Sequence, residues 1–97
     1  MTPNKLVFTA RANTDIKRRA RYLMSERGQA FATAWVDALF NWLEKIAEGG
    51  ALIGTAHPVQ SQIRTFGYKR QATILAEFAQ GEMRIIRIYF PGQDWSR

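Results

Sequence analysis

The side chains best suited to chemistry stand close to the end of the chain, in the segment RIIRIYFPGQDW. This segment places Arg84, Arg87 and Tyr89 within six residues. Arginine can stabilise negative charge, and tyrosine can move a proton. His57 is the one imidazole and is a further candidate for a general base. It precedes Pro58 in a glycine-rich loop, where a lone histidine is more often a turn or capping residue.

Other kinds of chemistry are excluded by composition. The chain has no cysteine, which rules out a disulfide framework, a thiolate nucleophile and a cysteine-based zinc site. A single histidine also makes a histidine-based metal site improbable. We therefore predict neither a metal nor a cofactor.

The chain is strongly basic. Its 14 lysines and arginines outnumber its 8 acidic residues, giving a net charge of +6 and a pI near 10.3. Such an excess attracts polyanions and speeds encounter with them. The partners that it indicates are a nucleic acid, the ribosome or an acidic protein, and the alternative is a small basic protein without a specific partner.

The length of 97 residues predicts one domain, spanning 1–97, because so short a chain supports only one hydrophobic core. The first residues, MTPNKLVF, contain neither the apolar stretch of a signal peptide nor a membrane span. We therefore predict a cytoplasmic protein of bacterial type that does not associate with a membrane.

Hydrophobic spacing predicts one strand and then two helices. Residues 4–9 alternate, with Leu6 and Phe8 on one face. From about residue 11 the apolar residues recur at helical spacing, and Gly28 supplies the stop. This apolar stripe consists of Ala12, Ile16, Ala20 and Leu23.

The second predicted helix, 29–48, is apolar around most of its circumference. Trp35 and Trp42 stand seven residues apart on one flank, so we expect them to anchor a core or an interface. One face of a small sheet is too narrow to cover so much apolar surface. Either the first helix or a partner protein must cover the rest.

Three further strands are predicted at 62–66, 71–78 and 83–90, after a loop at 49–60. Short turns join them, which favours an antiparallel meander. The complete order is β-α-α-β-β-β. We therefore predict an α+β fold, in which an antiparallel sheet carries a helical hairpin on one face.

Alternation along the last strands assigns their faces. Ile86, Ile88 and Phe90 should join the core, and Arg84 should enter the core face only at the end of the strand. Arg87 should stand on the open face beside Tyr89, and across from Thr73 or Glu77. The core face of the preceding strand would consist of Ala72, Ile74, Ala76 and Phe78.

Taken together, the helical pair followed by AHP, the strand pair IRTFGYKRQATILAEF and the closing RIIRIYFPGQDW resemble the RelE/ParE superfamily of bacterial type II toxins. The resemblance covers nearly the whole chain. It implies a RelE/ParE-like fold and a toxin encoded beside a small antitoxin. That antitoxin would cover the helices and the open sheet.

Resemblance to the RelE branch implies a ribosome-dependent ribonuclease that cuts messenger RNA without a metal. That reaction must activate a ribose hydroxyl, stabilise charge on the phosphate and protonate the leaving oxygen. Arg87 and Arg70 would hold the phosphate, and Tyr89 or Lys69 would move the proton. The full candidate set is Arg64, Lys69, Arg70, Arg87 and Tyr89. For Tyr89 alone, the simpler role is an aromatic ring resting on the open face.

Resemblance to the ParE branch implies capture of DNA gyrase without catalysis, through the helical hairpin or the last strand. The tail favours this branch, since it offers Gln93, Asp94 and Trp95 where RelE-type ribonucleases carry catalytic Arg and Tyr. We expect Asp94 to fix the tail by bonding to a nearby arginine. The prediction is thus a growth-inhibiting toxin with either mechanism, and the alternative is a non-toxic basic protein-binding domain of the same fold.

Overall fold

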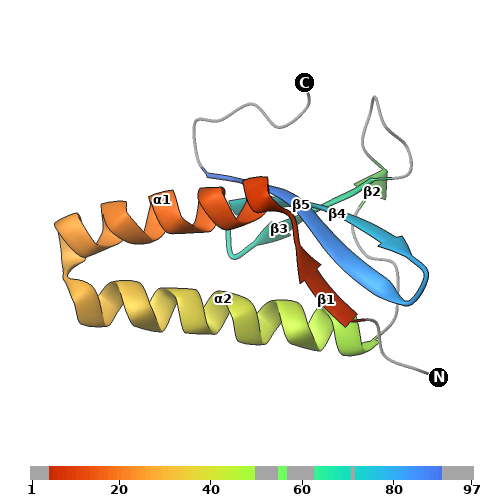
Figure 1. The fold of residues 1–97 in the computed structure, drawn as a ribbon. Coiled ribbons are helices and arrows are strands. Elements are labelled where there is room, and N and C mark those ends of the chain that lie inside the picture. The colour runs from red at the N-terminus through yellow and green to blue at the C-terminus, as the bar shows by residue number, and fades with distance from the viewer. Residues whose placement is uncertain (1–4, 50–54, 57–62, 71, 91–97) are drawn as a thin grey trace.

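A computed structural model describes residues 5–49, 55–56, 63–70 and 72–90 (Figure 1). The predicted order is confirmed, with one addition: a two-residue strand lies in the segment predicted to be a loop. The elements are β1 (Lys5–Phe8), α1 (Ala10–Arg27), α2 (Gln29–Gly49), β2 (Thr55–Ala56), β3 (Arg64–Tyr68), β4 (Ala72–Ala79) and β5 (Glu82–Tyr89).

The two helices form an antiparallel hairpin whose turn projects away from the sheet (Figure 1). Thr9 caps α1, because its Oγ1 accepts a hydrogen bond from the Ala12 N–H at 3.1 Å. Gly28 ends α1 with a φ of +93°, which glycine adopts without strain, and α2 begins at the next residue. The tight turn therefore keeps the helices side by side.

The sheet has the strand order β1-β5-β4-β3-β2. The meander of β3, β4 and β5 is antiparallel as predicted, but β1 runs parallel to β5, so the sheet is mixed. A parallel neighbour is possible because the whole helical hairpin lies between β1 and the meander, and parallel pairs need such long connections. Gln80 and Gly81, with φ values of 53° and 75°, make the tight turn between β4 and β5.

A β-bulge in β5 changes which of its residues reach the core. Leu75 pairs with Arg87 and Ala76 pairs with Ile85, so Ile86 has no partner on β4. Below the bulge the alternation is therefore reversed, and Met83 and Ile85 are fully buried. The predicted core position of Ile86 and the predicted entry of Arg84 into the core face are wrong: Ile86 is half-buried and Arg84 is exposed.

Above the bulge, the predictions for the core hold. Ile88 is fully buried and Phe90 packs against the core, which also takes in the predicted residues of β4. From the helices, the core receives Ala12 and Ile16 of α1 and, from α2, Leu39, Leu43 and Ala47. The helical hairpin therefore covers one face of the sheet, as predicted.

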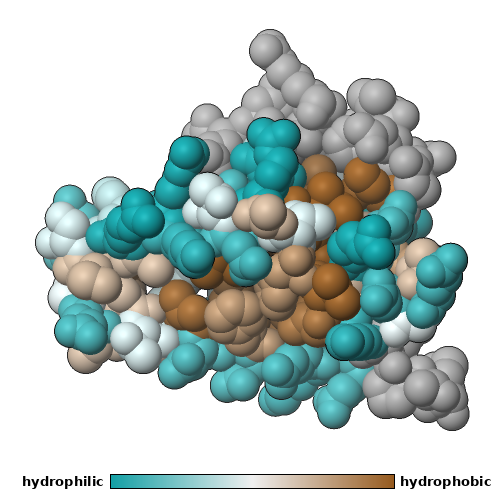
Figure 2. Space-filling model, in the orientation of Figure 1, coloured by the Kyte–Doolittle hydropathy of each residue, from teal (hydrophilic) through white to brown (hydrophobic). Residues whose placement is uncertain are grey.

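The wide apolar surface of α2 is mostly used within the chain. The Trp42 ring lies 4.9 Å from the ring of Tyr68, and the Trp35 ring lies 5.8 Å from that of Phe90. Both tryptophans thus pack against the core, which confirms one of their two predicted roles. Figure 2 shows hydrophobic side chains along the seam between the helices and hydrophilic ones along their outer sides. Phe31, near the turn, remains 38% exposed.

Within the part of the chain that the structure describes, neither helix has the combination of length and apolar character needed to cross a membrane.

Candidate functional site

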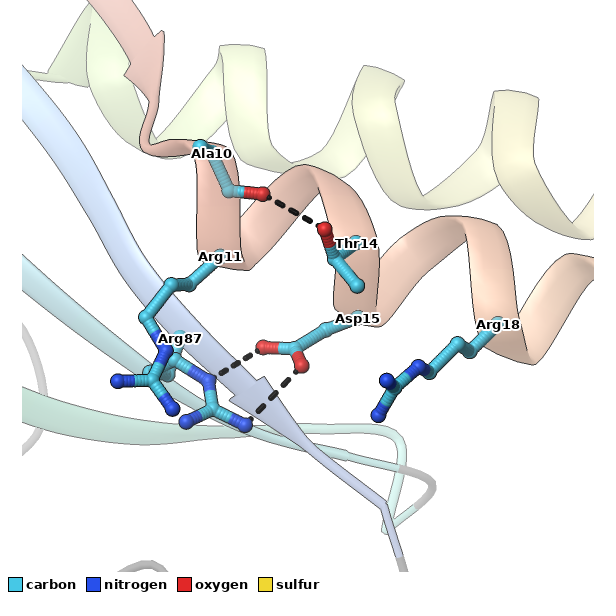
Figure 3. Close-up of a pocket in the computed structure, with 6 residues that line it drawn as sticks. All are labelled: Ala10, Arg11, Thr14, Asp15, Arg18 and Arg87. Atoms are coloured by element: carbon cyan, nitrogen blue, oxygen red, sulfur yellow. Dashed lines mark hydrogen bonds and ion pairs between the residues drawn. The ribbon is translucent and has the colours of Figure 1, made fainter.

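A pocket of about 220 Å³ lies between the first half of α1 and β5 (Figure 3). Three arginines and one carboxylate line it, together with two small residues. Its lining consists of Ala10, Arg11, Thr14, Asp15, Arg18 and Arg87.

Helical spacing and one strand edge bring these residues together. Arg11, Thr14 and Arg18 follow one another at spacings of three and four, so they share a side of α1. Thr9 fixes the start of this helix on the strand, since its N–H donates to the Ile85 carbonyl at 3.1 Å and its Oγ1 donates to the Ile86 carbonyl at 2.8 Å. Since β1 pairs with β5 only as far as Ile85, the next part of the β5 edge is left to α1.

Asp15 joins α1 to this edge. Its Oδ2 accepts hydrogen bonds from Arg87 Nε at 2.8 Å and from the Ile88 backbone N–H at 2.9 Å, and its Oδ1 accepts one from Arg87 Nη2 at 3.1 Å. The side chain of Asp15 is only 9% exposed and that of Arg87 is 21% exposed. The carboxylate thus satisfies an edge N–H and holds a guanidinium in one orientation.

Arg87 is held on a second side by Tyr89, whose ring centroid lies 4.7 Å from the guanidinium carbon. The hydrogen bond to Asp15 raises the pKa of Arg87 above its ordinary value; the charges of Asp15 and Tyr89 also raise this pKa, and partial burial opposes them. The guanidinium therefore stays charged. Its Nη1 makes no hydrogen bond to any residue that the structure describes.

The pocket carries an excess of positive charge. Arg11 and Arg18 are exposed, and neither forms an ion pair within the described residues. In Figure 3 they extend from α1 on either side of Asp15, and both line the same pocket as Arg87. Three guanidinium groups thus surround a single carboxylate, an arrangement that attracts anions.

The charge is also divided between the helices. α1 carries six basic and two acidic residues, a net charge of +4, whereas α2 carries one basic and three acidic residues, a net charge of −2. The helix that lines the pocket therefore carries +4 of the net charge of +6 of the chain.

Two of the sequence-predicted site residues, Arg87 and Tyr89, are in contact. Arg87 lies across from Leu75, so neither of its two predicted partners, Thr73 and Glu77, is correct. Tyr89 is the residue that lies across from Thr73. The predicted face of Arg87 is confirmed, because the adjacent Ile88 is fully buried in the core and Arg87 therefore points to the other face. Its ion pair was not predicted. The acid on α1 binds it at the strand edge, an interaction between residues 72 apart in sequence that strand alternation cannot indicate.

The other three predicted residues lie elsewhere. Arg64 pairs with Ala76, and directly paired residues share a face, so Arg64 is on the side of the sheet that the helices cover. Lys69 and Arg70 form the exposed turn between β3 and β4, with φ values of 48° and 59°. This turn is at the same end of the sheet as Tyr89 but follows a strand that is two positions away. The five residues therefore do not converge.

Asp15 is the residue that the sequence reasoning missed. The sequence does contain a signal for Asp15. This acid lies next to Ile16 and three residues after Ala12, so it borders the apolar stripe of an otherwise basic helix. The predictions for His57, Gln93, Asp94 and Trp95 lie outside the described residues. Among the residues that are described, no group of three or more His, Cys, Asp or Glu side chains could hold a metal ion.

The fold has a counterpart among solved structures. A chain of the chromosomal ParDE TA system from P. aeruginosa matches it with a TM-score of 0.76. The match covers 90% of this chain and 95% of that chain, at 16% sequence identity. No family model and no curated protein matches the sequence. The two chains share a fold, which confirms the RelE/ParE-like architecture predicted from the sequence.

Proposed function

We propose that this chain is the toxin of a type II toxin–antitoxin pair and that it stops growth by binding DNA gyrase rather than by cutting messenger RNA. A cognate antitoxin would neutralise it. The fold shared with a chain of a ParDE system supports the toxin–antitoxin assignment. The arrangement of the arginines supports binding over cleavage.

The observation that carries the choice of mechanism is the Asp15–Arg87 pair. Cleavage of RNA needs a base, a charge-stabilising group and an acid within reach of one phosphate. Arg87, the central residue of the predicted ribonuclease set, has its Nε and Nη2 bound to Asp15. Arg64 is on the other side of the sheet. Groups separated in this way favour a surface that binds over a site that cleaves.

The helical hairpin offers the surface for such binding. Among the described residues, the large hydrophobic ones that remain exposed are Tyr22, Met24 and Phe31, at 53%, 48% and 38%, and all three lie within six residues of Gly28 at the turn. Arg27 lies over the ring of Phe31 at 4.2 Å. Apolar anchors beside arginines are typical of protein–protein interfaces. We therefore place the gyrase contact on this end of the hairpin.

The test is induced expression in a bacterial host that lacks the antitoxin. We expect growth arrest, cleaved chromosomal DNA and an SOS response, with transcript ends unchanged. The double variant Tyr22→Ser/Phe31→Ser should lose these effects. Arg84→Ala, an exposed change on the sheet, is the matched control and should keep them. Growth arrest with intact DNA and no SOS response would contradict the gyrase mechanism.

The ribonuclease mechanism remains the second candidate, because Arg87 and Tyr89 are in contact and Lys69 and Arg70 lie at the same end of the sheet as Tyr89. It predicts cuts at fixed codon positions in ribosome-bound messages. Tyr89→Phe should abolish those cuts while leaving the fold intact, since the ring is retained.

A non-toxic, protein-binding role is the outcome that would contradict both mechanisms. Expression without any growth defect in a host free of the antitoxin would support it.

A further inference from the structure

The guanidinium of Arg87 is already positioned to receive a ligand. Asp15 binds its Nε–Nη2 edge and the Tyr89 ring covers one of its faces, so its orientation is fixed before anything binds. The adjoining edge, formed by Nη1 and Nη2, can still donate to an oxyanion. Binding there needs little further ordering of the side chain, and such pre-organisation favours affinity.

Arg11 and Arg18 provide mobile charges on either side of this fixed group. Both are exposed and line the same pocket as Arg87 (Figure 3). Like charges that line one pocket repel each other, and a bound anion offsets this repulsion. With one carboxylate against three guanidiniums, the pocket has an excess of two positive charges.

The size and composition of the pocket favour one oxyanion group over a row of phosphates. Its 220 Å³ lies between one helix and one strand, and the carboxylate of Asp15 lies within it. Binding of single-stranded nucleic acid also relies on aromatic rings that stack with the bases. The two rings at this end of β5 instead pack against guanidinium groups: Tyr89 against Arg87 and Phe90 against Arg19.

We propose that the pocket between α1 and β5 binds the side-chain carboxylate of an acidic peptide segment of a partner protein. Arg87 receives the carboxylate in a fixed geometry, and Arg11 and Arg18 close on it from either side. The charge of α1 draws the rest of the acidic segment along the helix. This inference goes beyond the proposed function and concerns the isolated protein, so it stands even if the growth test fails.

The first experiment measures binding of a fluorescent hexaglutamate peptide to the purified protein by anisotropy at low salt. Arg11→Gln/Arg18→Gln should weaken binding by about tenfold or more, because each arginine supplies a charge-assisted hydrogen bond. Lys17→Gln/Arg21→Gln is the matched control, since it removes the same charge from exposed positions on the same helix outside the pocket. We expect it to weaken binding by no more than about threefold, through loss of long-range attraction alone.

Equal losses of affinity in the two double variants would overturn the proposal. They would show that the peptide is attracted by the overall positive charge of the protein and not by a specific site. A decauridylate RNA that binds more tightly than the peptide, and that depends on Arg11 and Arg18, would also overturn it in favour of a nucleic-acid site.

A second measurement reports on the pocket directly. The Nε–H resonance of Arg87 should shift during titration of the wild-type protein with hexaglutamate, and it should shift much less in Arg11→Gln/Arg18→Gln. Both substituted arginines are exposed, so the variant should keep the wild-type circular dichroism spectrum. An Arg87 resonance that stays unmoved at saturating peptide would contradict the proposal.

Discussion

Replacement of Asp15 by alanine tests whether this carboxylate is what holds α1 against the last strand. The change removes three hydrogen bonds at once, two from Arg87 and one from the Ile88 N–H. It also leaves both donors without an acceptor at a position that is 8% exposed in the native protein. We therefore expect a large loss of stability from a single substitution.

The magnitude follows from the two groups left behind. Removal of one member of a buried ion pair costs about 3–5 kcal/mol. Arg87 keeps 21% exposure, so water partly solvates the orphaned guanidinium, and we expect a loss of about 3 kcal/mol, at the lower end of that range. In a domain of this size, such a loss lowers Tm by about 12–24 °C. Asp15→Asn should cost less, because the amide oxygen still accepts a hydrogen bond.

Urea unfolding followed by tryptophan fluorescence measures the change, because Trp35 and Trp42 pack against the core. The matched control is Arg84→Ala, which breaks a 3.1 Å ion pair with Glu82 whose side chains are 48% and 35% exposed. Exposed pairs contribute at most about 1 kcal/mol. If Asp15→Ala destabilised the protein no more than Arg84→Ala, the structural role assigned to Asp15 would be refuted.

The bulge, the helix cap and the charge of Arg87 each lead to a prediction. Ile85→Ala should lower the free energy of unfolding by about 2–5 kcal/mol, and Ile86→Ala by clearly less, because the bulge directs Ile85 into the core. Equal decreases in the free energy of unfolding, measured by urea denaturation, would contradict the bulge. Thr9→Ala should cost about 1–2 kcal/mol and Thr9→Ser much less, as measured by calorimetry, since the hydroxyl caps α1. The folded state raises the pKa of Arg87, so its contribution is complete below the unfolded pKa and is lost only as pH rises through the folded one. The stability difference between wild type and Arg87→Met should thus stay constant from neutral pH to about pH 10, and a steady decline over that range would contradict the assignment.

The parts of the fold that the sequence predicted are those that depend on short-range periodicity. Ala12 and Ile16 recur at helical spacing, and Ile74 and Ala76 alternate along a strand, so a count along the chain assigns their faces. The meander follows from short turns. In each case the deciding information lies within a few residues.

The features that were predicted wrongly or missed depend on interactions that local periodicity does not contain. The bulge at Ile86 adds one residue to β5 and reverses the alternation of the residues that precede it. No residue type in RIIRIYF indicates a bulge at this position. The contact between Asp15 and Arg87 joins segments that are distant in sequence, and it depends on the tertiary packing of α1 against the edge of β5. The parallel pairing of β1 likewise depends on where the hairpin returns the chain.

The unequal charges of the two helices give the molecule a preferred direction of approach. Because α1 and α2 lie side by side with net charges of +4 and −2, they form an electric dipole across the hairpin. The field of an acidic partner would orient the protein before contact, so that α1 faces the partner. A larger fraction of encounters would then be productive, which raises the association rate. Added salt would slow this capture while leaving the lifetime of the finished complex nearly unchanged.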